Sequence, residues 1–247
     1  MSSRTTVLAL LARAVASAPA DEPLPARLCR ACVSILGADG GAITLSSTRA
    51  ERLTVSASDG TSARLEDLQD VLGEGPGQEA YRSGSAVVVR VDGARGGPFP
   101  MFAELAADVA GPLTIWAIPL HPAGVPVGVV TLYRVAGDLA YGGEDAQFLA
   151  DAVGAALLDE RTHDQAPFAA WSERARVHQA AGMVVAQLAI SPNDALAILR
   201  AHAFAEGATL DAIAVDVVER RLTFSPTDQD ESSEDPPLGD SMGNGQT

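Results

Sequence analysis

Apolar and polar residues follow two different periods along this chain, and the change between them divides it into two parts. Up to about residue 160, runs that alternate like a β-strand are mixed with runs at the spacing of a helix. Strand-like alternation occupies 42–47, 52–58, 85–92 and the hairpin pattern 113–135. Helical spacing occupies 21–37, 62–73, 78–84, 99–111 and 144–161. This order predicts an antiparallel α+β domain.

Beyond Pro167 only the helical period remains, in the three segments 170–190, 191–207 and 209–224. Ser191 is a predicted N-cap, Gly207 a predicted helix end, and Thr209 the cap of the last helix. We therefore predict an all-α unit of three helices. The predicted divisions are an N-terminal helix over 1–19, the α+β domain over 20–160, a linker over 161–170, the helical domain over 171–225 and a tail over 226–247.

The first residues imitate a secretory signal, because Arg4 precedes an apolar stretch that small residues follow. Arg13 interrupts that stretch, however, and Leu8, Leu11 and Val15 fall on one face of a helix. We expect an ordinary amphipathic helix rather than a cleaved signal, and therefore a cytoplasmic protein.

Charge and composition exclude some classes of binding partner. The chain is 47% hydrophobic with a net charge of −15, and all 17 of its basic residues are Arg. Such an acidic chain lacks broad electrostatic affinity for nucleic acid, so any RNA binding has to read loop shape and bases. Residues 226–247 hold six acids and almost no large apolar side chain, which predicts a disordered tail. No run is long and apolar enough to cross a bilayer, so we expect no membrane partner.

The segment VLGEGPGQEAYRSG, residues 71–84, carries four glycines and raises the question of a phosphate site. A dinucleotide fingerprint needs Gly-x-Gly-x-x-Gly between a strand and a helix. Gly73 and Gly75 fit this pattern, but Gln78 stands at the third position, and the preceding run has the helical period. We expect a tight connection into a short helix that ends at Gly84.

Cys29 and Cys32 are the only cysteines. A structural zinc site needs four ligands, and the sequence offers neither a second Cys pair nor a His pair near them. Both sulfurs fall on the apolar face that carries Leu28 and Ile35, so core packing is the expected role. The four histidines are scattered, and no catalytic motif occurs. We predict no metal site, no cofactor and no catalytic residue.

Two segments of the first domain resemble the GAF domain, a small-molecule sensor fold. They are LGEGPGQEAYRSGSAVVV, residues 72–89, and IWAIPLHPAGVPVGVVTLYR, residues 115–134. The resemblance implies a GAF fold over residues 20–160 and an unidentified small-molecule effector. The candidate ligand-binding residues are Phe99, Met101, Phe102 and Trp116. The same apolar residues fit a plain core equally well.

Residues 177–222 resemble the ANTAR domain, a three-helix RNA-binding module of transcription antiterminators. The matching pieces are Gln179-Ala180, Gly182-Met183-Val184, Asp194-Ala195, Leu199-Arg200, Ala203, and Leu210 with Ile213-Ala214. Ala181 stands where many members carry Lys. The resemblance implies that the domain binds paired stem-loops in nascent transcripts and favours an antiterminator. The candidate RNA-binding residues are Arg176, Gln179, Arg200, Arg220 and Arg221.

Other interpretations remain open. Arg220 and Arg221 also fit charge compensation at a helix end, and Arg200 fits an ion pair with Glu206 or Asp211. A redox enzyme that resembles the GAF-type methionine sulfoxide reductases, and a module that binds only protein, are the alternatives to an RNA-binding regulator. The long apolar stripe of residues 144–161 predicts a homodimer, against the alternative of a helix that lies flat on its own domain.

Overall fold

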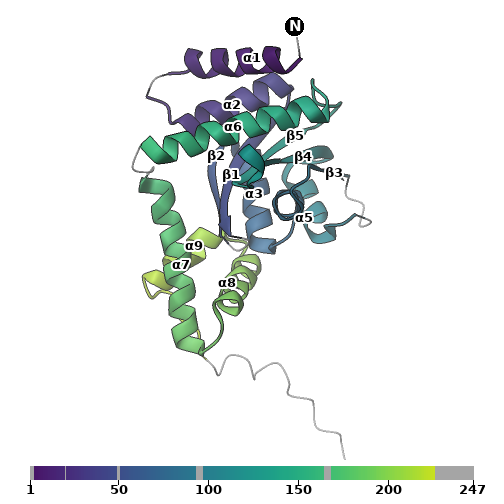
Figure 1. Cartoon of the computed structure of the whole chain (residues 1–247). Coiled ribbons are helices and arrows are strands. Elements are labelled where there is room, and N and C mark those ends of the chain that lie inside the picture. Colours follow the sequence, from purple (N-terminus) through teal and green to yellow (C-terminus); the bar gives the residue numbers. More distant parts are fainter. Residues whose placement is uncertain (1–2, 20, 49–50, 93–96, 164–167, 226–247) are drawn as a thin grey trace, which may run out of the picture.

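The computed structural model describes residues 3–19, 21–48, 51–92, 97–163 and 168–225. Within these residues, five strands form one antiparallel sheet between two layers of helices, and a separate group of helices lies at one end (Figure 1). The strands are β1 (Gly40–Thr48), β2 (Glu51–Ala57), β3 (Val87–Val91), β4 (Leu113–Leu120) and β5 (Gly128–Arg134). Their order across the sheet is β2-β1-β5-β4-β3, so β2 and β3 are its edges. The predicted α+β fold is confirmed.

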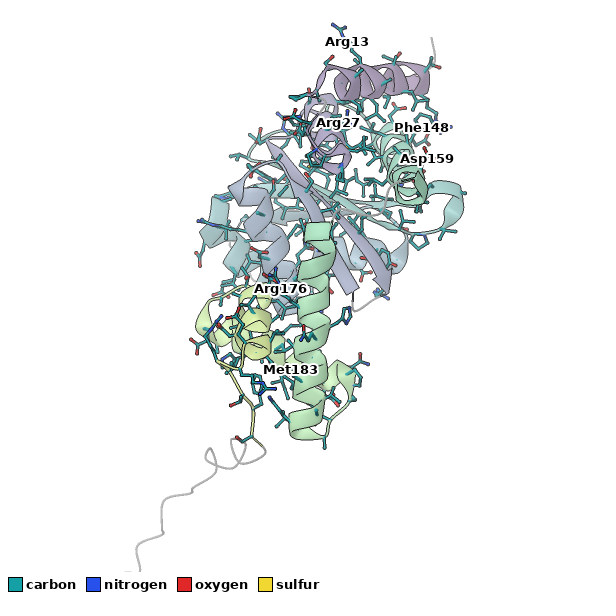
Figure 2. The ribbon with its side chains drawn as sticks, turned by 90° about the vertical axis from the view of Figure 1, so that its left-hand side faces the viewer. Arg13, Arg27, Phe148, Asp159, Arg176 and Met183 are labelled. Atoms are coloured by element: carbon teal, nitrogen blue, oxygen red, sulfur yellow. The ribbon has the colours of Figure 1, made fainter. Side chains whose placement is uncertain are left out.

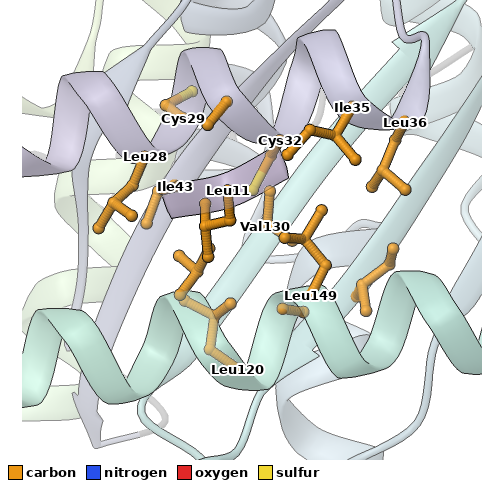
Figure 3. Packing of buried hydrophobic residues seen from close by; sticks show 14 of the residues in the cluster. Leu11, Leu28, Cys29, Cys32, Ile35, Leu36, Ile43, Leu120, Val130 and Leu149 are labelled. Atoms are coloured by element: carbon orange, nitrogen blue, oxygen red, sulfur yellow. The ribbon is translucent and has the colours of Figure 1, made fainter. Parts of the chain in front are cut away.

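The first layer of helices packs on one face of the sheet. It consists of α1 (Ser3–Ser17), α2 (Leu24–Leu36) and α6 (Gly143–His163). Its core joins Leu28, Cys32, Leu120 and Leu149 (Figure 3). The second layer covers the opposite face and consists of α3 (Gly60–Leu72), α4 (Pro76–Ser83) and α5 (Pro100–Ala110).

Helix α1 adds an outer cover to the first layer. It packs on α2 and α6 through Val7, which is fully buried, and Leu11 (Figure 1). Of the predicted face, Leu11 and Val15 pack on this core, but Leu8 is 42% exposed. Val7 is buried in its place, because steps of three and four residues from Leu11 reach neighbouring sides of the same helix.

The apolar stripe of α6 is used within the chain. Leu149, Val153 and Leu157 are buried in the core that α1, α2 and the sheet share. The helix therefore lies flat on its own domain. The stripe that suggested a homodimer is already covered in this chain, and the homodimer stays a prediction.

The remaining helices form a second unit. They are α7 (Phe168–Leu188), α8 (Pro192–Glu206) and α9 (Leu210–Val218). The side chain of Ser191 accepts from the amide of Asp194, that of Thr209 accepts from Ala212, and Gly207 ends α8 with φ 60°. These three predicted caps are confirmed. The core of this unit includes Val184 and Leu199.

Two further observations concern the chain as a whole. In the described parts no single helix is long and apolar enough to cross a membrane, although the bent pair Arg176–Leu188 and Pro192–Glu206 would be by length and composition alone. The predicted acidic tail, residues 226–247, lies outside the described residues.

Candidate functional site

The glycine-rich segment joins two helices. Gly73 ends α3 with φ 68°, Gly75 precedes α4 with φ 143°, and Gly84 ends α4 with φ 67°. All three lie in backbone regions that favour glycine. The segment is a helix-to-helix turn, as predicted.

The amides of this turn are occupied inside the protein. The amide of Gly77 donates to Oε1 of Gln69 at 2.6 Å, and the amide of Gly73 donates to the carbonyl oxygen of Gln69 at 3.0 Å. A Cβ on Gly75 would lie 2.6 Å from Cγ of Gln69. A phosphate site at a helix start needs amides that point at the ligand. Here the buried Gln69 side chain takes that place.

Gln69 belongs to a buried polar network. The carboxylate of Glu66, 1% exposed, accepts from Oγ1 of Thr44 at 2.9 Å, from Nη2 of Arg52 at 2.8 Å and from Nε2 of Gln69 at 2.8 Å. Nη1 of Arg52 donates to Oδ1 of Asp70 at 2.8 Å. Two of these bonds join α3 to β2, one joins it to β1, and one lies within α3, so the network fixes α3 against β1 and β2.

The acids of α3 crowd one another. Burial raises the pKa of Asp70 to about 6; Arg52 opposes this change and Glu66 adds to it. Burial also raises the pKa of Asp67, with contributions from Glu66 and from Asp211 of α9. The charge of Asp211 thus reaches α3 from the helical unit.

The helical unit docks on the end of α3. Nε of Arg200 donates to the carbonyl oxygen of Asp70 at 3.0 Å. Val71 of α3 is buried in the core of α7–α9 rather than in the core beside the sheet. The α8 helix lies next to the C-terminal end of α3 (Figure 1).

A pocket of about 320 Å³ opens beside the glycine-rich turn. It is lined by Arg52, Gly73, Glu74, Gly75, Gln78, Glu79, Tyr81, Arg82 and Phe99. The side chain of Arg52 is 5% exposed, and its Nε has no hydrogen-bond partner among the described residues. The pocket therefore combines the rings of Tyr81 and Phe99 with charged side chains in its lining.

Both cysteine thiols are buried and free. Sγ of Cys29 donates to the carbonyl oxygen of Gly41 at 3.2 Å, and burial raises the pKa of this thiol to about 11. Burial raises the pKa of Cys32 further. Because the reactive form is the thiolate, neither thiol is prepared for nucleophilic or redox chemistry. The predicted core packing is confirmed (Figure 3).

Within the described ranges, no group of three or more His, Cys, Asp or Glu side chains could hold a metal ion.

Two family models match the chain. The GAF domain model matches residues 24–157, more than half of the chain, and the ANTAR domain model matches residues 169–218. The chain is a GAF–ANTAR protein. It joins a sensor domain, formed by the sheet with α2–α6, to an RNA-binding antitermination module, formed by α7–α9.

Solved structures resemble parts of the GAF–ANTAR chain at low identity. The GAF domain of a phosphoenolpyruvate-protein phosphotransferase from Coxiella burnetii is 15% identical, covering 65% of this chain and 96% of that one, with a TM-score of 0.45. The nlh2 GAF domain of A. aeolicus in an inactive state is 12% identical, covering 66% and 98%, with a TM-score of 0.41. An RNA-binding Light-Oxygen-Voltage receptor is 20% identical, covering 73% and 46%, with a TM-score of 0.22. None of the curated proteins matches the chain. The assignment therefore rests on the family models.

The predicted RNA-binding residues of the ANTAR domain are spread over different surroundings. Gln179 is exposed on α7, and Arg176 is half-buried beside Asp211, with its Nε 3.4 Å from Oδ1 (Figure 2). Arg220 and Arg221 are exposed after α9, and Nη2 of Arg221 lies 2.6 Å from Oδ1 of Asp216. Arg200 contacts α3, not Glu206 or Asp211. The set does not form one continuous cationic surface in this arrangement.

The predicted ligand-binding residues of the GAF domain do not meet in one cavity. Phe102 is fully buried in the core beneath α3 and α5, while Trp116 packs on the opposite face of the sheet. Met101 is 45% exposed. Only Phe99 lines the pocket at the glycine-rich turn. Neighbouring residues of a strand point to opposite faces, which separates Trp116 from the Ile115 side that Phe102 contacts.

The network residues Arg52, Glu66, Gln69 and Asp70 were missed by sequence reasoning. Glu66, Gln69 and Asp70 stand three and four positions apart in the 62–73 segment, so they share a helix face. That spacing was the available signal. The spacing alone does not show that the face is buried, because the partner Arg52 comes from β2.

Proposed function

We propose that this GAF–ANTAR protein is a ligand-responsive antitermination regulator that binds stem-loops of nascent RNA in the cytoplasm. The observation that carries the proposal is the ANTAR match over 169–218, which coincides with the capped and packed helices α7–α9. Burial of both thiols argues against the redox enzyme, because neither Cys29 nor Cys32 offers a thiolate. No observation favours a module that binds only protein.

We expect few cationic side chains of the ANTAR domain to contact the RNA. Arg220 is exposed and has φ 61°, a left-handed conformation that is uncommon for residues other than glycine. This residue ends α9, since the amides of Arg221 and Leu222 both donate to the carbonyl oxygen of Asp216. The guanidinium of Arg220 can stack on an unstacked loop base or bind a base edge, which suits RNA recognition by a domain with little net charge.

The effector would bind in the pocket beside the glycine-rich turn. Tyr81 and Phe99 provide ring surfaces, and Arg52 and Arg82 bring guanidinium groups to the lining. We propose a small, largely apolar molecule with at least one hydrogen-bond acceptor, because such a ligand would cover the rings and face these cations. Phe99 is the residue of the predicted ligand set that this proposal retains.

The RNA proposal is tested by gel-shift titration of the full chain. A structured stem-loop RNA should bind, and duplex DNA of the same length should compete poorly. Arg220→Ala should weaken binding about tenfold, the loss expected for one base contact of about 1.4 kcal/mol. Arg64→Ala removes an equal charge from the exposed side of α3 and serves as the control. Equal effects of the two variants, or equal affinity for duplex DNA, would contradict the proposal.

A further inference from the structure

The contact between α3 and α8 is partly apolar. Val71 lies on the GAF helix α3 but is only 8% exposed, because it packs with Ala195, Leu199 and Ala203 of the ANTAR core. It takes no part in the cores on either side of the sheet. A GAF residue is therefore buried only while the two domains are docked.

The contact is also polar, and it completes the end of a helix. The last four carbonyl groups of a helix lack partners within it, and together they carry partial negative charge. Arg200 brings a hydrogen-bond donor and a positive charge to this end of α3, since its Nε donates to the carbonyl oxygen of Asp70 at 3.0 Å. A Cβ on Gly73 would lie 3.4 Å from Nη1 of Arg200, an ordinary contact distance, so the guanidinium lies directly against the turn that ends α3.

Charged groups of both domains meet at this contact. Asp70 of α3 is the acid whose charge acts on Arg200, while Asp67 of α3 and Asp211 of α9 act on each other. Arg52 pairs with Asp70, and Arg176 pairs with Asp211. In the docked arrangement the Arg200 guanidinium is half-buried and bonded to α3, so an RNA phosphate has little access to it. Docking to α3 and contact with RNA are therefore competing uses of the Arg200 guanidinium.

We propose that docking of α8 on the C-terminal end of α3 is an autoinhibitory contact that withholds Arg200 from RNA. The inference rests on the proposed RNA binding and adds its regulation. The docked chain is the weak RNA binder, and separation of α3 from α8 frees Arg200. The apparent RNA affinity of the chain is then reduced to the fraction of molecules that are undocked.

The pocket lies beside the contact between α3 and α8, so a ligand in the pocket would touch residues at that contact. Gly73 and Arg52 line the pocket, Gly73 faces Arg200, and Arg52 holds the carboxylate of Asp70. A molecule that binds there touches two residues that shape the docking surface. Its effect on RNA affinity depends on which arrangement it binds more tightly.

The test uses full-length variants and needs no ligand. Val71→Asn replaces the apolar contact with a neutral polar side chain at a position outside the GAF cores, so it should undock the domains without unfolding either. Hydrogen exchange in the last turn of α3 and in α8 reports undocking directly. Stem-loop affinity should rise about fivefold, as expected if about a fifth of the wild-type chain is undocked. Arg64→Gln, on the exposed side of α3, is the control.

The variant Arg200→Gln then distinguishes the possible outcomes. In the Val71→Asn background it should lower stem-loop affinity by about tenfold, the loss of one good contact. In the wild-type background the net loss should be only about twofold, because the substitution also removes the docking contact of Arg200 and so raises the undocked fraction by up to about fivefold. If Val71→Asn undocks the domains and the affinity does not rise, the autoinhibitory contact is overturned while RNA binding stands. If neither the wild type nor any variant binds the stem-loop, the proposed function itself fails.

Discussion

At the scale of single residues, the turn between α3 and α4 depends on a glycine that touches its neighbour. Gly75 has φ 143°, and a Cβ there would lie 2.6 Å from Cγ of the buried Gln69. Gly84 has a similar requirement in its backbone, φ 67°, but open space where a Cβ would be. A side chain at Gly84 would meet backbone strain alone, whereas one at Gly75 would also collide with Gln69.

Gly75→Ala should therefore destabilise the protein more than Gly84→Ala. We expect the free energy of unfolding to fall by about 3 kcal/mol for Gly75→Ala and about 1 kcal/mol for Gly84→Ala, because only the first also displaces Gln69. Urea denaturation followed by circular dichroism measures both. Equal losses would mean that Gln69 moves aside without cost.

Asp70 gives a second residue-level prediction, on pH. Its pKa is raised from 3.8 to about 6, so the folded state binds the proton more tightly than the unfolded state. Stability from this group is complete below the unfolded pKa and is lost as pH rises to about 6. We expect Asp70 to reduce the free energy of unfolding by about 1–3 kcal/mol over this range. Asp70→Asn should remove that decrease in a pH series of denaturation curves; an unchanged slope would contradict the raised pKa.

At the scale of elements, helix α1 shows what the spacing of apolar residues predicts and what it leaves open. Its existence follows from the spacing of Leu8, Leu11 and Val15, yet Leu8 faces solvent and Val7 is buried. Val7 and Leu8 lie four and three positions before Leu11, and the spacing alone does not say which of them meets α2 and α6.

Two substitutions on adjacent residues of α1 test the observed face. Val7→Asp should lower the free energy of unfolding by about 3 kcal/mol, because it buries an unpaired carboxylate against α2 and α6. Leu8→Asp, at a position 42% exposed, should change it by less than about 0.5 kcal/mol. Thermal melting of the two variants gives the comparison. A larger loss for Leu8→Asp would restore the face predicted from the sequence.

Much of the fold could be predicted from the sequence for a physical reason. Some features depend only on neighbours within a few residues along the chain. They are the hairpin of β4 and β5, the helix ends at Gly84 and Gly207, and the caps at Ser191 and Thr209. The buried network of Arg52 and Glu66 depends on groups 14 positions apart, and the Arg200 contact on groups 130 positions apart. Local periods carry no information about such pairs, so the sequence predicted neither the buried network nor the partner of Arg200, for which it offered RNA, Glu206 or Asp211.

At the scale of the whole molecule, α1 separates the inner helices α2 and α6 from solvent on the side away from the sheet. The apolar residues that suggested a dimer lie beneath it, so the predicted dimer would need another surface while α1 is in place.

Removing residues 1–18 should uncover the apolar sides of α2 and α6. Exposed apolar area of that kind favours association, so we expect the shortened chain to self-associate more strongly than the full chain. Light scattering over a range of micromolar concentrations compares the two chains. A shortened chain that has the same mass distribution as the full chain would show that these helices do not associate when exposed.

The capping of α3 by Arg200 has a consequence for exchanging domains between proteins. Arg200 of the ANTAR domain caps the end of α3 in the GAF domain. Each domain therefore depends on the other for a hydrogen-bond partner at their contact. A chimera that joins another sensor to these α7–α9 helices would leave Leu199 without Val71 and Arg200 without its carbonyl. If docking on α3 is autoinhibitory as proposed, such a fusion would bind RNA without control by its sensor, unless the new sensor also brought a helix ending in an apolar residue and a glycine. The two domains of this chain are therefore matched parts, and the boundary between them is not a neutral point for recombination.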